Sequence, residues 1–188
     1  MCHALLQDPK FFRLLLRIDV ELADEVRAGG CACGCVLHRA KYPRKPKGCP
    51  AEFRSEFEWR FSFCGNRCRG RTTPMSVRYL GRRVYLGLVM VLVSARDVGQ
   101  TPAAGRLCAA LDVPVRTLRR WRNWWTQQLP LTAFWQAASA RFMPPVATEH
   151  IAASLLERFV GDAADVLLRL LVFLTPLTVG PIALSEGC

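Results

Sequence analysis

Hydrophobic residues recur at helical spacing near the start of the chain and form one apolar stripe. The stripe consists of Phe11, Leu14, Leu15, Ile18, Leu22 and Val26. Asp8 directly before Pro9 is typical of a helix start, and Gly29 and Gly30 favour a stop. The pattern predicts a helix over residues 9–29 that packs on the rest of the chain, with a homodimer contact as the alternative.

A period of two replaces the helical spacing between residues 53 and 63. Aromatic residues stand at positions 53, 57, 59, 61 and 63, and the even positions between them are polar or charged. Such alternation predicts a half-buried β-strand with its aromatic side chains packed inward. A second short strand is expected over residues 75–80, after a turn at residues 69–74.

Residues 106–125 predict two helices joined by a tight turn at residues 112–114. Apolar residues at positions 107, 111, 118 and 121 place one buried face on each helix, and Pro114 suits the first turn of the second helix. Arg116, Arg120 and Asn123 share the opposite face, with Arg119 beside them. This arrangement is typical of a DNA-binding helix-turn-helix, whose second helix reads base edges.

The other apolar stretches predict further helices. Residues 84–96 read as the first helix of a three-helix unit that the helix-turn-helix completes. Residues 131–142 and 151–174 predict two or three more helices, broken near Pro144 and Gly161, with Asp162 as a cap. The apolar run 163–184 is long enough to span a bilayer, but Asp165, Arg169 and later prolines favour a buried helix and a tail. No membrane partner is expected.

The chain has nine cysteines, and its start does not resemble a secretory signal. Clustered cysteines in a cytoplasmic protein favour metal binding over disulfides. Cys31 and Cys33 make one short turn, and Cys64 and Cys68 make another at the end of the aromatic strand. These four thiolates predict one structural Zn²⁺ site. The alternatives for one ligand position are Cys35, Cys49 and His38.

The resulting fold class is mainly α with a small β, zinc-ribbon-like part near the N-terminus. We expect an amphipathic helix over residues 1–30 and a zinc-ribbon-like domain over residues 31–80. A helix-turn-helix domain over residues 81–130 and a helical region over residues 131–188 follow. The ribbon segment has few aliphatic residues, so a metal would make up for its small core.

Charge adds a partner class to this fold. The formal net charge is +11, and residues 36–83 hold thirteen lysines or arginines against three glutamates. Such an excess favours nucleic acid or another polyanion. Prolines keep the basic loop 39–47 extended, which suits contact with phosphates, although a solvated loop is an equal alternative. The predicted backbone contacts are Arg44, Lys45, Lys47 and Arg71.

Catalysis is not expected. A DNA-cutting transposase needs carboxylates that hold two metal ions, and the acidic residues here are scattered among several elements. Neither His38 nor His150 has an evident nucleophile partner in the sequence. The three tryptophans at positions 124, 125 and 135 are expected to pack in the core and not to stack on bases.

Several short runs resemble a group of short bacterial proteins, some of them transposase-related, that combine a zinc-ribbon-like start with a helix-turn-helix. The similarity covers about residues 30–125. Its motifs are the CACG run at 31–34, LHRA at 37–40, YPRKP at 42–46, FSFC at 61–64, RTTP at 71–74, SVR at 76–78 and GRRVY at 81–85. Cys35 replaces the glycine expected in that group, and the resemblance therefore implies Cys31 and Cys33 as ligands.

These observations predict a DNA-binding protein of the mobile-element type. Its base contacts would be Arg116, Arg119, Arg120 and Asn123, and the basic ribbon would contact phosphates of double-stranded DNA. The alternatives are an accessory subunit that docks on a recombinase or transposase through the C-terminal helices, or a transcriptional regulator. RNA binding through stacking on the aromatic strand is a third hypothesis, which burial of those aromatic residues would exclude.

Overall fold

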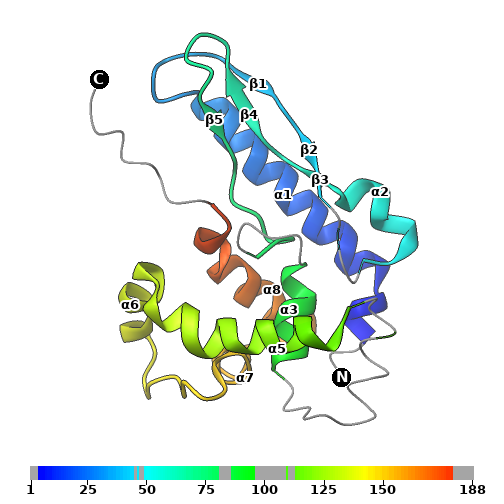
Figure 1. Ribbon diagram of the computed structural model, residues 1–188, viewed down its shortest axis with the longest axis vertical. Helices are drawn as coiled ribbons and strands as arrows, with labels where there is room; N and C mark the ends of the chain where they lie inside the picture. Colours follow the sequence, from blue (N-terminus) through cyan, green and yellow to red (C-terminus); the bar gives the residue numbers. More distant parts are fainter. Residues whose placement is uncertain are drawn as a thin grey trace.

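The computed structural model describes residues 4–44, 46, 49–80, 86–95, 109 and 113–179. The chain is mainly helical, with a small antiparallel β region in its first half (Figure 1). Its main helices are α1 (Pro9–Gly29), α2 (Arg54–Phe57), α3 (Gly87–Ser94), α5 (Val115–Asn123), α6 (Ala133–Ala138), α7 (Ile151–Leu156) and α8 (Ala163–Phe173). Its strands are β1 (Leu37–Arg39), β2 (Tyr42–Pro43), β3 (Trp59–Arg60), β4 (Phe63–Gly65) and β5 (Arg71–Thr72).

Short helical turns complete these elements. A π-helical segment (Trp124–Gln128) continues α5 directly. The 3₁₀ turns are Ala4–Gln7, Ala51–Phe53, Leu129–Leu131, Ser139–Arg141 and Thr175–Thr178.

Helix α1 begins and ends where the sequence predicts. The Asp8 side chain accepts a hydrogen bond from the backbone N–H of Lys10 at 2.9 Å, and Gly30 ends the helix with a φ of 72°. The buried residues are Phe11, Phe12, Leu15, Asp19 and Ala23. The buried face is therefore rotated from the predicted stripe, and a carboxylate lies at its centre.

The strand predicted over residues 53–63 is wrong in its first half. Residues 51–57 form a 3₁₀ turn and the helix α2, and only β3 and β4 are extended. Phe53 and Phe57 are four residues apart, so they share a face in a helix as well as in a strand. Both rings pack on Phe12 of α1, with ring centroids 5.5 and 5.3 Å away. Packing against α1 therefore selects the helix over the strand for this segment.

The turn at residue 58 also changes which side chains face inward in β3. Trp59 is 41% exposed, whereas Arg60 is 4% exposed. Arg60 Nη2 donates to the Pro74 carbonyl at 2.6 Å, so a backbone acceptor lies beside the buried guanidinium. Phe53, Phe57 and Phe63 are buried as expected, whereas Trp59 is exposed and Phe61 is half-buried. Burial therefore excludes stacking on RNA for three of the five aromatic residues and not for Trp59.

Residues 75–80 do not form the second predicted strand. β5 takes that role earlier, at Arg71–Thr72, and pairs antiparallel with β4, which pairs in turn with β1. The backbone N–H of Ser76 donates to Thr178 Oγ1 at 3.0 Å, and that of Val77 donates to Asp19 Oδ1 at 2.7 Å. Side chains thus occupy the donors that a β-ladder would use.

A buried ion pair connects α1 to this segment. Arg78 Nε donates to Asp19 Oδ2 at 2.7 Å, and neither side chain is exposed to solvent. The Ser76 hydroxyl also donates to Asp19, and Arg78 Nη2 donates to the Trp59 carbonyl at 3.0 Å. The pair is therefore satisfied on both sides, as a buried charge requires.

The part of the second half of the chain that the structure describes is mainly helical, as predicted. α3 lies within the helix expected over residues 84–96, and α6, α7 and α8 match the C-terminal predictions. Asp162 caps α8 by accepting from the backbone N–H groups of Ala164 and Asp165 at 2.8 and 2.9 Å. None of the helices in the described part of the chain combines the length and the apolar character needed to cross a bilayer.

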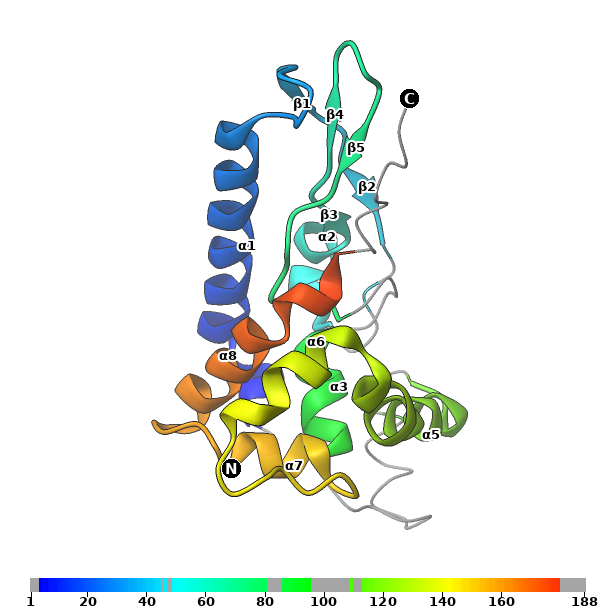
Figure 2. The ribbon, with the colours of Figure 1, turned by 90° about the vertical axis from the view of Figure 1, so that its left-hand side faces the viewer.

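One continuous core joins these helices to α1 and to the base of the β region. Phe12, Phe57, Leu88, Trp121 and Leu170 all belong to it. Figures 1 and 2 show α1 running along the molecule, with the β region toward one end and α3, α5 and α7 toward the other. The four predicted segments therefore share one core.

Part of the predicted helix-turn-helix lies outside the described residues. This applies to the connecting loop 97–102 and to its first helix, apart from Ala109, which is helical. The second helix is present as α5, with Pro114 as the residue directly before it. The complete helix-turn-helix thus stays a prediction.

Candidate metal centre and nucleic-acid interface

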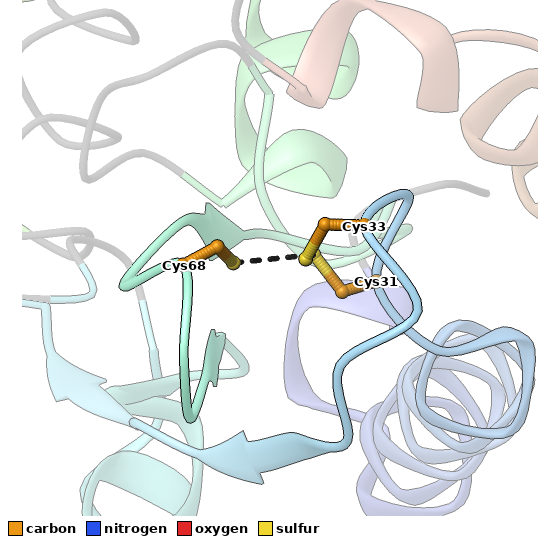
Figure 3. A group of neighbouring side chains, drawn as sticks. All are labelled: Cys31, Cys33 and Cys68. Atoms are coloured by element: carbon orange, nitrogen blue, oxygen red, sulfur yellow. Dashed lines mark hydrogen bonds between the residues drawn. The ribbon is translucent and has the colours of Figure 1, made fainter.

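Two turns bring three cysteine thiols together at the end of the β region (Figure 3). The Sγ atoms of Cys31 and Cys33 lie 3.1 Å apart, and those of Cys31 and Cys68 lie 3.5 Å apart. All three ligand atoms lie within 4.8 Å of one another, and they belong to half-buried or exposed residues. This group can hold a metal ion.

Local hydrogen bonds shape the first turn, which follows directly on α1. The N–H of Gly34 donates to the Cys31 carbonyl at 2.8 Å, and the N–H of Cys31 donates to the Cys35 carbonyl at 3.1 Å. Gly34 has a φ of 76°, a conformation that glycine adopts without strain. The reversal places Cys31 and Cys33 on the side that faces the second turn.

The second turn lies between β4 and β5. The N–H of Gly65 donates to the Gly70 carbonyl at 3.0 Å, which closes the loop, and the N–H of Gly70 donates to Cys68 Sγ at 3.3 Å. These contacts fix where the turn holds the Cys68 sulfur, close to Cys31.

Gly65 provides the space for this sulfur. A Cβ added at Gly65 would lie 2.5 Å from Cys68 Sγ and 3.7 Å from Cys31 Sγ. Tetrahedral Zn–S bonds of about 2.3 Å require sulfur atoms roughly 3.8 Å apart. The observed separations of 3.1 and 3.5 Å need only a small expansion to reach that value. The arrangement and the all-thiol donor set fit zinc.

Cys35 lies next to this group of three, on the side of Cys33, although its sulfur does not lie within 4.8 Å of all three. Its Sγ accepts a hydrogen bond from the Cys33 thiol at 3.2 Å. That bond lowers the pKa of Cys35, and backbone N–H groups near Cys68 add to the effect. The identical x3 spacing of Cys31–Cys35 and Cys64–Cys68 is the sequence signal that singles out this residue.

The other predicted ligands lie apart from the group of three. Cys64 is on β4, between two inward-facing residues, and its thiol contacts the Gly65 carbonyl at 3.6 Å. Cys49 is buried, which raises the pKa of its thiol to about 11. His38 is exposed and pairs with Cys64 across the sheet. Cys2, Cys108 and Cys188 lie outside the described residues.

Helix α5 separates its buried and exposed residues sharply. Thr117, Leu118 and Trp121 are buried against the core. The four predicted base-contacting residues are all exposed, namely Arg116, Arg119, Arg120 and Asn123. Beyond α5, Trp125 and Trp135 are buried and Trp124 is half-buried, which confirms that these rings pack in the core.

The predicted phosphate contacts Arg44 and Arg71 gather around Tyr42. The Arg44 guanidinium lies 4.7 Å from the centre of the Tyr42 ring, and that of Arg71 lies 5.8 Å from it. Arg44 Nη2 also donates to the Tyr42 hydroxyl at 3.3 Å. The two arginines come from segments 27 residues apart and form one basic cluster. Lys45 and Lys47 lie outside the described residues.

The elements that carry the two sets of basic residues lie apart along the length of the molecule but on a common side. The strands are toward one end and α5 is toward the other in both views. Figure 2 shows α1 on one side, with the strands and α5 on the opposite side. A ligand that touches both sets of residues would have to extend along this side.

The C-terminal helices offer less docking surface than the sequence suggests. Six apolar residues of these helices would form the docking face for a partner. Leu155, Leu167 and Leu170 are buried in the core at 0–1% exposure, and Leu156, Val166 and Phe173 are half-buried. Val172 of α8 is exposed at 48%. Most of the apolar character of these helices therefore serves internal packing.

Comparison with protein-family models, with curated proteins and with solved structures finds no match for this chain. The resemblance to transposase-related proteins therefore stays a prediction from the residues that carry it. Three features of the described residues bear on function, namely the cysteine cluster, α5 and the basic cluster around Tyr42.

Proposed function

We propose that the protein is a DNA-binding protein of the mobile-element type, in which a structural zinc ion holds a basic ribbon. α5 would lie in the major groove as the recognition helix. The observation that carries this proposal is the division of α5 into a buried face and a polar face with Arg116, Arg119 and Asn123 exposed. Arginine reads guanine and asparagine reads adenine in the major groove.

The zinc would be bound by Cys31, Cys33 and Cys68, with Cys35 as the fourth ligand in place of Cys64. A second small core supports this role, because its buried residues are only Ala23, Leu37 and Phe63. So little apolar burial contributes modest stability, and a metal that binds only the folded turns adds to it. Four thiolates leave no open position, so the metal would be structural and not catalytic.

The cluster around Tyr42 supports contact with the DNA backbone. Arg44 and Arg71 carry fixed positive charge, and their packing on the Tyr42 ring restricts the freedom of both side chains. Contacts to phosphates add affinity without sequence preference and make binding depend on salt. Since the strands and α5 lie on a common side of the molecule, one duplex would reach both.

Selection of bound sequences from a random duplex library tests the proposal, followed by titration of the selected site. Arg116→Ala is expected to weaken binding to the selected site by about 1–3 kcal/mol and to relax the preference at one base position. Arg71→Ala is expected to weaken binding to selected and random duplexes alike and to reduce the salt dependence of that binding. No enrichment, or equal losses for both variants on both duplexes, would contradict the proposal.

A further inference from the structure

A pocket of about 370 Å³ opens between α1 and the β region, away from the cysteine cluster and from the predicted base contacts. Its apolar lining includes Leu16, Val20 and Ala23 of α1 and Phe63 of β4. The volume lies within the range of sites that bind small molecules or single chemical groups, roughly 300–1,000 Å³. The pocket is therefore large enough for a planar ring.

Two aromatic side chains make this pocket unusual. Trp59 lines it and remains 41% exposed, although every other tryptophan in the described part of the chain is less exposed. Phe61 lines it as well and is half-buried. The exposed indole of Trp59 therefore provides a stacking surface that internal packing does not use. The Phe61 ring lines the same pocket, but it packs on the second small core and lies 5.3 Å from the Arg78 guanidinium.

Charges of both signs surround these rings. Lys41 Nζ lies 4.9 Å from the centre of the Phe61 ring. The Arg39 guanidinium lies 3.8 Å from Asp24, and both side chains are more than half exposed, so this ion pair is weak and the cation can turn to a ligand. Glu56 adds a second carboxylate to the lining.

We infer that this pocket binds one unpaired nucleotide of a single-stranded nucleic acid. A nucleobase would stack on Trp59 in the pocket that Phe61 also lines, and its phosphate would contact Arg39 and Lys41. A carboxylate, from Asp24 or Glu56, would accept from an exocyclic amino group. Cytosine, adenine and guanine have such a group and thymine does not, so the lining disfavours thymine.

This inference does not depend on the duplex proposed for α5. The pocket is built from α1 and the β region, and none of the predicted base-contacting residues lines it. DNA and RNA strands supply the same stacked base and phosphate, and Trp59 and the cations do not distinguish the sugar. The experiment therefore includes both kinds of strand.

Fluorescence anisotropy with labelled oligo(dC), oligo(dT) and oligo(rC) of equal length tests the inference on the full chain. Oligo(dC) or oligo(rC) is expected to bind, and Trp59→Ala to weaken that binding about tenfold, since loss of one stacked base is worth that much. Trp59→Phe, which keeps a ring, is expected to retain most of the affinity. Because Trp59 is exposed, both variants should unfold at nearly the same urea concentration as the parent protein.

Unchanged binding in Trp59→Ala, or no binding of any strand, would overturn the inference. Equal affinity for oligo(dC) and oligo(dT) would overturn the carboxylate contact. Duplex binding, measured in parallel, separates the two proposals. Trp59→Ala should leave it unchanged, while Arg116→Ala should weaken it without affecting the single strands.

Discussion

Removal of the charge of Asp19 is expected to destabilise the protein more than any other neutral replacement on α1. In Asp19→Asn, the shape is kept, but the Arg78 guanidinium stays buried without a counter-charge. Arg78 is fully buried beneath three aromatic rings, with its centre 5.1–5.3 Å from those of Phe57, Phe61 and Tyr79. The three aromatic rings offset only part of the stability lost with the Asp19 charge, because each cation–π contact is worth about 0.5–2 kcal/mol.

Breaking a buried, hydrogen-bonded pair by removing one partner costs about 3–5 kcal/mol. The free energy of unfolding of an ordinary domain is about 5–15 kcal/mol, so the variant keeps only part of that stability. With a urea dependence of about 2 kcal/mol per molar, the unfolding midpoint should fall by about 2 M. Urea titration followed by circular dichroism gives this midpoint.

The exposed pair on the same helix provides the control. Asp24 lies 3.8 Å from Arg39, and both side chains are more than half exposed. Asp24→Asn should therefore change stability by less than about 1 kcal/mol. A double variant that adds Arg78→Met to Asp19→Asn should lose less than the sum of the single losses, since it removes the uncompensated charge. Additive losses, or an Asp19→Asn cost equal to that of the control, would refute the reasoning.

Three further changes test the metal turns and the buried tyrosine. Gly65→Ala should displace Cys68 Sγ and weaken zinc binding at least tenfold in a chelator competition, whereas Gly29→Ala, which meets no atom within 4 Å, should not. Cys35→Ser should lower the zinc content of purified protein, and Cys64→Ser should leave it at one ion per chain; the reverse result would restore Cys64 as the ligand. Burial raises the pKa of Tyr79 to about 12, against about 10 in an unfolded chain, so its stabilising effect is complete below pH 10 and is lost as pH rises toward 12. Tyr79→Phe should flatten the fall of the urea midpoint as the pH rises from 10 toward 12, and an unchanged fall would exclude this residue as its cause.

Local signals in the sequence predict the helices well. Asp8, Pro9 and Gly30 determine the limits of α1, and Asp162 determines the start of α8, because caps act over a few residues and need no tertiary partner. α5 is predicted for a similar reason, since its buried and charged positions alternate at one helical period.

The β region could be predicted only in part, because tertiary contacts decide it. Phe53 and Phe57 satisfy the strand and helix periods equally, and their packing on Phe12 selects the helix. Nothing local marks Asp19 as the partner of Arg78, 59 residues away. Long-range ion pairs of this kind leave no periodic trace in a single sequence.

The cysteine site shows the same limit at shorter range. Spacing alone identifies two turns that can supply thiolates, and three of the four predicted ligands lie together. The fourth predicted ligand, Cys64, lies apart from them because it belongs to the strand β4, whereas Cys35 lies in the first turn beside Cys33. The x3 spacing that Cys31 and Cys35 share with the second turn was the one available hint.

The contacts of Thr178 have a consequence for how the chain is made. Its Oγ1 accepts from the backbone of Ser76, and its carbonyl accepts from Arg60 at 3.5 Å. When a ribosome has synthesised the chain up to residue 78, about a hundred more residues must be added before Thr178 exists. Until then the backbone N–H of Ser76 and the Arg60 guanidinium lack Thr178 as an acceptor. Asp19 and Arg78 can pair before that point, but without the contacts that Thr178 makes beside them. The β region can therefore be completed only when the 3₁₀ turn Thr175–Thr178 has formed. Folding that begins during synthesis must end after translation has passed residue 178.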